Sequence, residues 1–173
     1  MKAAVIYQST YGHTEQYAKW IAEALGADLI SGKKATVSDL MPYDTLIFGG
    51  PVYIGSIKGG KLLRDNFAQL AGKRIALFTV ALTPVDNAEG YVQPLSTAMP
   101  ENAGDAVRVF HFPGGVETER LSLPHRMMMS MVRKMQASGK PDAPGGGMPP
   151  MDKEGINLVS QKAIEPLLAY VRS

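Results

Sequence analysis

Hydroxyl-bearing side chains and a glycine gather between residues 8 and 14, where an apolar run ends and a helical pattern begins. The stretch reads Gln-Ser-Thr-Tyr-Gly-His-Thr. A strand that runs straight into a helix presents unpaired backbone N–H groups and the positive end of the helix dipole at one point. Ser9, Thr10 and Thr14 add hydroxyl donors, and Gly12 lets the backbone wrap closely around a ligand. The turn therefore predicts a phosphate site, with simple helix capping by Ser9 or Thr10 as the alternative.

The kind of phosphate follows from the motifs that are absent. The turn has neither the G-x-x-x-x-G-K-[ST] pattern of nucleotide-hydrolysing P-loops nor the G-x-G-x-x-G pattern of dinucleotide folds. The turn thus offers no dedicated cation to neutralise a polyphosphate. A single phosphomonoester, held mainly by neutral donors and the helix dipole, fits the turn better, and a nucleotide hydrolase is excluded.

Composition narrows the chemistry further. The 173-residue chain has no cysteine and only three scattered histidines, which excludes disulfides and thiolate sites and argues against a metal centre. Any redox chemistry must then come from a bound cofactor. An apolar content of 45% with 20% charged residues is typical of one globular domain. The amino-terminal run resembles neither a signal peptide nor a membrane span, so we expect a complete cytoplasmic protein.

Apolar patterns then predict the elements that position this turn. Short apolar runs at residues 3–7, 27–31, 45–48, 73–82 and 106–112 are typical of strands in a parallel sheet, with Gly49-Gly50-Pro51 ending the third. Helical patterns lie between and after them, including a stretch at 87–99 that we expect to be broken. One of these patterns, after the first strand, places Ala18, Ile21, Ala22 and Leu25 on one face. The alternation predicts an α/β fold with helices on both faces of the sheet.

The turn and its surroundings resemble the flavodoxin family. "QSTYGHTEQYAKWIAEAL" is similar to that family's phosphate-binding loop, and "FGGPVYIGSI" and "TVALTPVDNAEGY" stand where its second and third cofactor loops lie. The resemblance covers essentially the whole chain and implies a single flavodoxin-like domain over residues 1–173. It implies a three-layer α/β/α sandwich around a five-stranded parallel sheet of order 2-1-3-4-5, with FMN beyond strands one and three.

The resemblance also implies which residues surround FMN. The first loop would contribute Ser9, Thr10, Tyr11, Gly12, His13 and Thr14, mainly as phosphate ligands. The second would contribute Pro51, Val52, Tyr53, Ile54, Gly55 and Ser56, and the third Ala81, Leu82 and Thr83. Tyr53 is expected to lie against the flavin ring and Gly55 to reorient near it. The alternatives are a loop-rim tyrosine without a ligand and an ordinary turn glycine.

Residues 116–155 form an insertion before the last helix. A helix from Pro124 to Ala137 is expected, with Met127, Met131, Met135, Met128 and Val132 on one arc. A flexible Gly/Pro-rich loop should follow it. Six bases against two acids give residues 108–140 a net charge of +4. The insertion resembles, more loosely, that of menaquinone-dependent protoporphyrinogen oxidases.

Two functional hypotheses follow. The first is an FMN-dependent, quinone-linked oxidoreductase, in which the flavin performs the chemistry and no side chain need be catalytic. The second is a non-catalytic flavodoxin-type carrier that docks to a partner redox enzyme. Lys58 and Lys61 after the second loop favour the first hypothesis if they lie near the flavin, and count for little if they are solvated. The basic methionine helix either packs on its own domain or makes a peripheral contact with the inner face of the membrane. Nucleic-acid binding is not expected.

Overall fold

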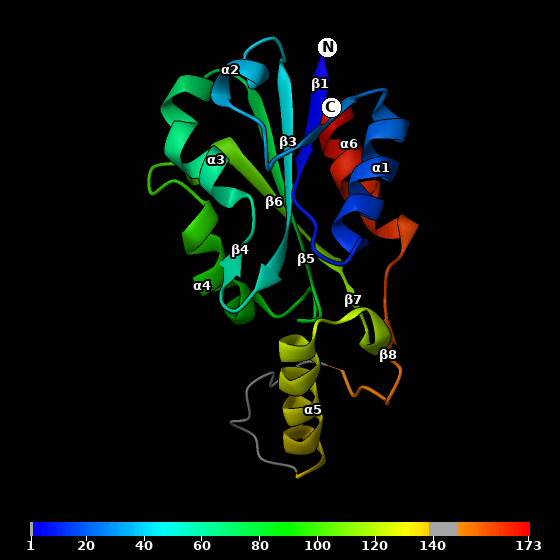
Figure 1. Ribbon diagram of the computed structural model, residues 1–173. Helices are drawn as coiled ribbons and strands as arrows, with labels where there is room; N and C mark the ends of the chain where they lie inside the picture. Colours follow the sequence, from blue (N-terminus) through cyan, green and yellow to red (C-terminus); the bar gives the residue numbers. More distant parts are fainter. Residues whose placement is uncertain (1, 139–148) are drawn as a thin grey trace.

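A parallel sheet forms the centre of the molecule. The structure is a computed structural model that describes residues 2–138 and 149–173. The sheet has the strand order β2-β1-β3-β5-β6, all neighbours being parallel (Figure 1). These strands are β1 (Ala3–Tyr7), β2 (Asp28–Ser31), β3 (Thr45–Tyr53), β5 (Arg74–Ala81) and β6 (Val107–Pro113). Counted along the chain without the short β4, this is the predicted order 2-1-3-4-5, so the predicted fold class is confirmed.

Helices cover both faces of the sheet. Figure 1 shows α1 and α6 on one face and α2, α3 and α4 on the other, while α5 lies beyond the carboxyl ends of the strands. The α-helices are α1 (His13–Leu25), α2 (Val37–Leu40), α3 (Gly60–Asn66), α4 (Ala88–Ala98), α5 (Leu123–Ala137) and α6 (Glu165–Arg172). Four short 3-10 turns are η1 (Phe67–Leu70), η2 (Gly104–Ala106), η3 (Thr118–Arg120) and η4 (Gln161–Ile164).

The core consists of two apolar clusters, one on each face of the sheet. Successive residues of a strand point to opposite faces, so β5 sends Ala76 and Phe78 to the α1/α6 side and Ile75 and Leu77 to the α3/α4 side. The α1 face predicted from the sequence is buried in the first cluster, where Ile21 has no exposed surface. Burial on both faces explains why the strands are nearly continuous apolar runs.

The third strand is longer than predicted. It does not end at Gly49-Gly50-Pro51 but continues to Tyr53. A Cβ on Gly49 would lie 2.0 Å from the ring of Phe78, and one on Gly50 would lie 1.9 Å from the carbonyl oxygen of Lys58. The two glycines are therefore strand residues that admit close neighbours, because the missing side chains leave room for a ring and a backbone.

A tight hairpin follows β3 and leads into β4 (Ser56–Ile57), which pairs antiparallel with it. Ile54 and Gly55 form its turn with φ values of 44° and 69°. Two positive φ values in a two-residue loop are the signature of a type I′ turn, which favours Asn or Gly. Ile54 is the only non-glycine residue with positive φ within the described residues, and its side chain is 73% exposed. The second predicted cofactor loop is thus built on a strained turn.

We expect Ile54→Asn to raise the free energy of unfolding of the flavin-free protein by about 1 kcal/mol, because Asn tolerates the left-handed conformation and little apolar burial is lost. Urea unfolding measures the difference. Val92→Asn is the control, since Val92 is a similarly exposed β-branched residue, 67%, in α4. An Ile54 variant no more stable than wild type would show that the turn stores no strain.

Three other expectations need correction or a limit. The helix at 88–98 is continuous although Pro94 lies inside it. Part of the insertion is ordered as a ladder, because β7 (Gly115–Glu117) pairs antiparallel with β8 (Gly155–Asn157). The predicted flexible Gly/Pro loop falls largely on residues 139–148, which lie outside the described residues.

Candidate functional site

A cavity of about 430 Å³ lies at the carboxyl ends of β1, β3, β5 and β6, with α5 forming one wall. Its volume is within the usual range for small-molecule sites. The residues that line it are Ser9, Thr10, Tyr11, His13, Thr14, Pro51, Val52, Tyr53, Ile54, Val80, Ala81, Leu82, Thr83, Gly114, Gly115, Val116, Leu121, His125, Met128, Met129 and Val132. This is the edge of a doubly wound sheet where ligands bind.

Twelve of the fifteen predicted cofactor residues line this cavity, and all three predicted loops reach it. Gly12, Gly55 and Ser56 are not among the lining residues. Gly12 is the N-cap of α1, and Gly55 is in the turn of the hairpin. Ser56 donates its hydroxyl to the Tyr53 carbonyl at 2.9 Å. The structure thus brings together three loops that are far apart in the sequence. Their role toward FMN stays a prediction.

The first loop has the geometry of an anion cradle. Gly12 is the N-cap of α1, with φ 98° and no side-chain cap, and its N–H donates to Ser9 Oγ at 3.0 Å. The capping alternative is therefore wrong, and the first-turn N–H groups of α1 remain available. Thr14 is only 1% exposed and lines the cavity. Its hydroxyl makes no hydrogen bond within the described residues and opens to the cavity, since no fully buried side-chain polar atom there lacks a partner, so it can donate to a ligand.

Contacts with α4 hold the third loop in place. The Tyr91 hydroxyl donates to the Thr83 carbonyl at 2.8 Å, and burial raises the pKa of Tyr91 to about 12. Tyr91 therefore stays protonated at neutral pH and remains a donor. Its ring stacks on His111, with ring centroids 3.6 Å apart, and a hydrogen bond joins His111 Nδ1 to Thr79 Oγ1 at 2.7 Å. These contacts fix the backbone of the third loop against the sheet.

The glycines after β6 form the wall opposite the second loop. The Gly114 N–H donates to the Ala81 carbonyl at 2.7 Å, which joins this wall to the third loop. A Cβ on Gly115 would lie 3.0 Å from His13 Nε2. Burial lowers the pKa of His13, and Arg120 lowers it further, while Glu117 opposes them. His13 therefore faces the cavity as a neutral ring at neutral pH.

His125 is a site residue that the sequence did not indicate. It is on α5, and its ring lies between the first and second loops: Nδ1 pairs with the Tyr11 hydroxyl and Nε2 with the Tyr53 hydroxyl. Both tyrosine rings meet it edge-on, at centroid distances of 5.7 and 5.0 Å. No local pattern signals this bridge, because the three residues are separated by 42 and 72 positions.

The predicted apolar arc of α5 is divided in the structure. Val132 is buried at 7% exposure and lines the cavity together with Met128 and Met129. Met127 and Met131, which we expected to share the face of Val132, are 75% and 59% exposed. The helix α5 is therefore oriented with His125 and Val132 toward the cavity. Leu123, Met127 and Met131 form a stripe on another side of the helix that is exposed to solvent.

The described part of the chain shows neither a cluster of three metal-binding side chains nor a helix both long and apolar enough to cross a bilayer.

The fold and cavity define an α/β/α protein with a cavity at the switch point of its sheet. Residues 4–143 match the family model described as a flavodoxin domain, and the chain belongs to this family. Homologues in this family bind a flavin, usually FMN.

Solved structures with the same fold share little sequence with the chain. Flavodoxin 2 from Bacillus cereus is 20% identical, with 64% of this chain and 84% of that chain covered and a TM-score of 0.44. The Trp repressor binding protein from Bacillus subtilis is 16% identical, with 65% and 85% covered and a TM-score of 0.46. A flavodoxin from the domain Archaea is 18% identical, with 64% and 84% covered and a TM-score of 0.40. A comparison with curated proteins found no match.

Proposed function

We propose that this protein binds FMN and is an oxidoreductase that reduces a flat, apolar acceptor of the quinone class. FMN would supply one- or two-electron transfer when bound. The residues fit it: the uncapped start of α1 and the free Thr14 hydroxyl suit a phosphate, and the largely apolar walls at Val52, Ala81 and Leu82 suit a flavin ring.

The position of α5 is the observation that favours an enzyme over a carrier. A carrier needs its flavin edge open to partner proteins, whereas here His125, Met128 and Met129 of α5 line the cavity and form one of its walls. Thioether and aromatic groups adapt to flat, polarisable molecules. A small acceptor can enter such a space more readily than a protein surface can approach it.

The decisive experiment compares two acceptors. The FMN-loaded protein is reduced under nitrogen by light with EDTA as the electron donor, and is then mixed with either 1,4-naphthoquinone or ferricytochrome c. We expect the quinone to reoxidise it at least about tenfold faster, a barrier difference of about 1.4 kcal/mol. Met128→Ala should slow the quinone reaction, whereas the exposed neighbour variant Met131→Ala should not. Preference for the protein acceptor would support the carrier function instead.

Thr14→Val is expected to weaken FMN binding by about 1.5 to 3 kcal/mol, the usual contribution of a hydrogen bond to a charged group. The two side chains are nearly isosteric, so the buried position stays filled. Fluorescence titration with FMN measures the change, and riboflavin, which lacks the phosphate, is the control ligand. Equal losses for both flavins would show that Thr14 supports the fold and does not bind phosphate.

We also propose that α5 brings the protein to the cytoplasmic face of the membrane, where apolar quinones dissolve. Leu123, Met127 and Met131 form an exposed apolar stripe on a helix that has bases and no acids.

Met127→Glu combined with Met131→Glu should reduce binding to phosphatidylglycerol vesicles at low salt at least about tenfold, because two carboxylates would face the anionic surface. Vesicle co-sedimentation measures this binding. Val92→Glu, an equally exposed position on α4, is the control and should bind as wild type. A wild-type protein that ignores these vesicles would refute the membrane contact.

A further inference from the structure

Lys58 connects the first and second loops of the site. It follows β4, and its Nζ lies 3.2 Å from Thr10 Oγ1 in the first loop. The same ammonium lies over the Tyr53 ring of the second loop, 4.6 Å from its centroid. A cation at this place was not predicted from the first loop, which has no lysine of its own.

The backbone holds Lys58 in place. Its N–H donates to the Pro51 carbonyl at 3.2 Å, and Gly50 leaves space for the Lys58 carbonyl, which would lie 1.9 Å from a Cβ at position 50. Gly59, with φ 85°, then begins α3. The close approach allowed by Gly50 therefore fixes the backbone position of Lys58. The contacts of the Lys58 ammonium with Thr10 and Tyr53 fix the position of the charge.

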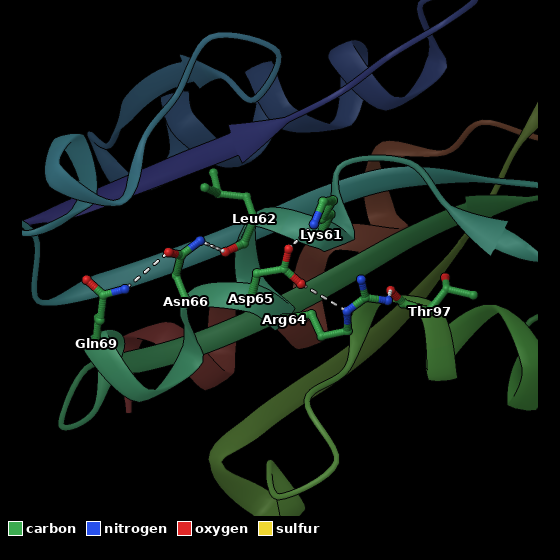
Figure 2. A network of polar contacts seen from close by, with 7 residues as sticks. All are labelled: Lys61, Leu62, Arg64, Asp65, Asn66, Gln69 and Thr97. Atoms are coloured by element: carbon green, nitrogen blue, oxygen red, sulfur yellow. Dashed lines mark hydrogen bonds and ion pairs between the residues drawn. The ribbon is translucent and has the colours of Figure 1, made fainter.

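The lysines and the arginine of α1 and α3 are in ion pairs. Figure 2 shows Lys61 and Arg64 both directed at Asp65, and Arg64 also donates to the Thr97 carbonyl at 2.9 Å. On α1, Lys19 pairs with Glu15 at 2.7 Å. Within residues 2–138 and 149–173, the Lys58 side chain is in no ion pair, and its one hydrogen bond is to the Thr10 hydroxyl. An unpaired cation is thus fixed beside the anion cradle.

We infer that Lys58 is the cationic ligand of the phosphate group bound in the first loop. The inference rests on the proposed FMN binding. The Lys58 ammonium touches the first loop through the Thr10 hydroxyl, and the same loop contributes the Thr14 hydroxyl, which lines the cavity, and the uncapped start of α1. Each of these groups is a donor. The phosphate is then held by charge as well as by neutral donors. Lys58 thereby selects the phosphorylated flavin over the unphosphorylated one.

Lys58→Met tests this, with Lys61→Met as the matched control three residues away. The dissociation constants of FMN and riboflavin are measured by fluorescence at about 20 and 300 mM NaCl, where screening differs strongly. We expect Lys58→Met to weaken FMN binding about tenfold to hundredfold at low salt and to flatten its salt dependence. Riboflavin should bind both variants as it binds wild type, and Lys58→Arg should retain most of the FMN affinity.

The outcomes separate the two proposals. If wild type binds FMN and Lys58→Met binds it equally well, Lys58 is no phosphate ligand although the proposed function stands. If Lys58→Met loses riboflavin as much as FMN, with an unchanged circular dichroism spectrum, Lys58 holds the loops together and binds no phosphate. If Lys61→Met loses as much affinity as Lys58→Met, the effect is general charge and not a ligand. If wild type binds neither flavin, the proposed function fails and this inference fails with it.

Discussion

Replacing Gly49 by alanine is expected to lower the free energy of unfolding by about 3 kcal/mol or more, at the upper end of the cost of overpacking. The new Cβ would lie 2.0 Å from Phe78 Cζ, and Phe78 has no exposed surface into which its ring could move. Gly49 pairs with Tyr7 on one side and Phe78 on the other, so the backbone cannot withdraw without breaking the centre of the sheet. Urea unfolding of the flavin-free protein measures the loss.

A double-mutant cycle isolates the cause. Phe78→Leu removes much of the ring that the new Cβ would meet, so Gly49→Ala should cost less in that background than in wild type. Strict additivity of the two changes would mean that the ring does not cause the loss. Full stability of Gly49→Ala alone would contradict the register that places Gly49 beside Phe78.

Removing the hydroxyl of Tyr17 should destabilise the protein by about 1 to 3 kcal/mol, because Tyr17→Phe leaves two partly buried backbone groups without their partner. The hydroxyl donates to the Pro113 carbonyl at 2.7 Å and accepts from the Ser160 N–H at 3.0 Å. Tyr17 has no exposed surface, and burial raises the pKa of its hydroxyl. It thereby fastens α1, the end of β6 and the start of the last helical segment to one another. FMN affinity should fall as well, since Pro113 leads into the glycine wall of the cavity.

Tyr43→Phe is the matched control for Tyr17→Phe. The Tyr43 hydroxyl also donates, to Asp28 Oδ2 at 2.8 Å, but this bond is exposed and water replaces it. We expect a change within about 0.5 kcal/mol. Thermal and urea unfolding of both variants compare the two. Equal losses would mean that the buried hydroxyl of Tyr17 is no more important than an exposed one.

Local patterns were sufficient for the order and type of the main elements. Continuous apolar runs predict strands covered on both faces, and the spacing of Ala18, Ile21 and Ala22 predicts the buried side of α1. Both signals are properties of neighbouring residues. The structure of the first loop could also be predicted, because a strand, a glycine and the start of a helix are adjacent in the chain. The donors of this loop need no distant partner.

The structural roles of the glycines were predicted less well, because a glycine can either end a strand or permit a close contact inside one. Gly49 and Gly50 resemble a turn in sequence, yet they lie inside β3. What decides between the two is the Phe78 ring and the Lys58 carbonyl, which come from other segments. A glycine in the sequence does not indicate which distant residue will pack against it in the folded protein.

The sequence by itself determined the α/β order of elements, the strand–glycine–helix turn that is predicted to bind an anion, and the amphipathic, basic character of α5. Each of these depends on residues within a few positions of one another. Only the tertiary structure decided that His125 lies between Tyr11 and Tyr53, that Lys58 points to Thr10 while Lys61 pairs with Asp65, and that Met127 stays exposed while Val132 is buried. The helical period of the sequence identifies which residues share an apolar face, but it does not say which side of the helix faces the cavity. Likewise a lysine's charge is visible in the sequence, whereas its partner depends on which distant loops the folded sheet brings to the same edge.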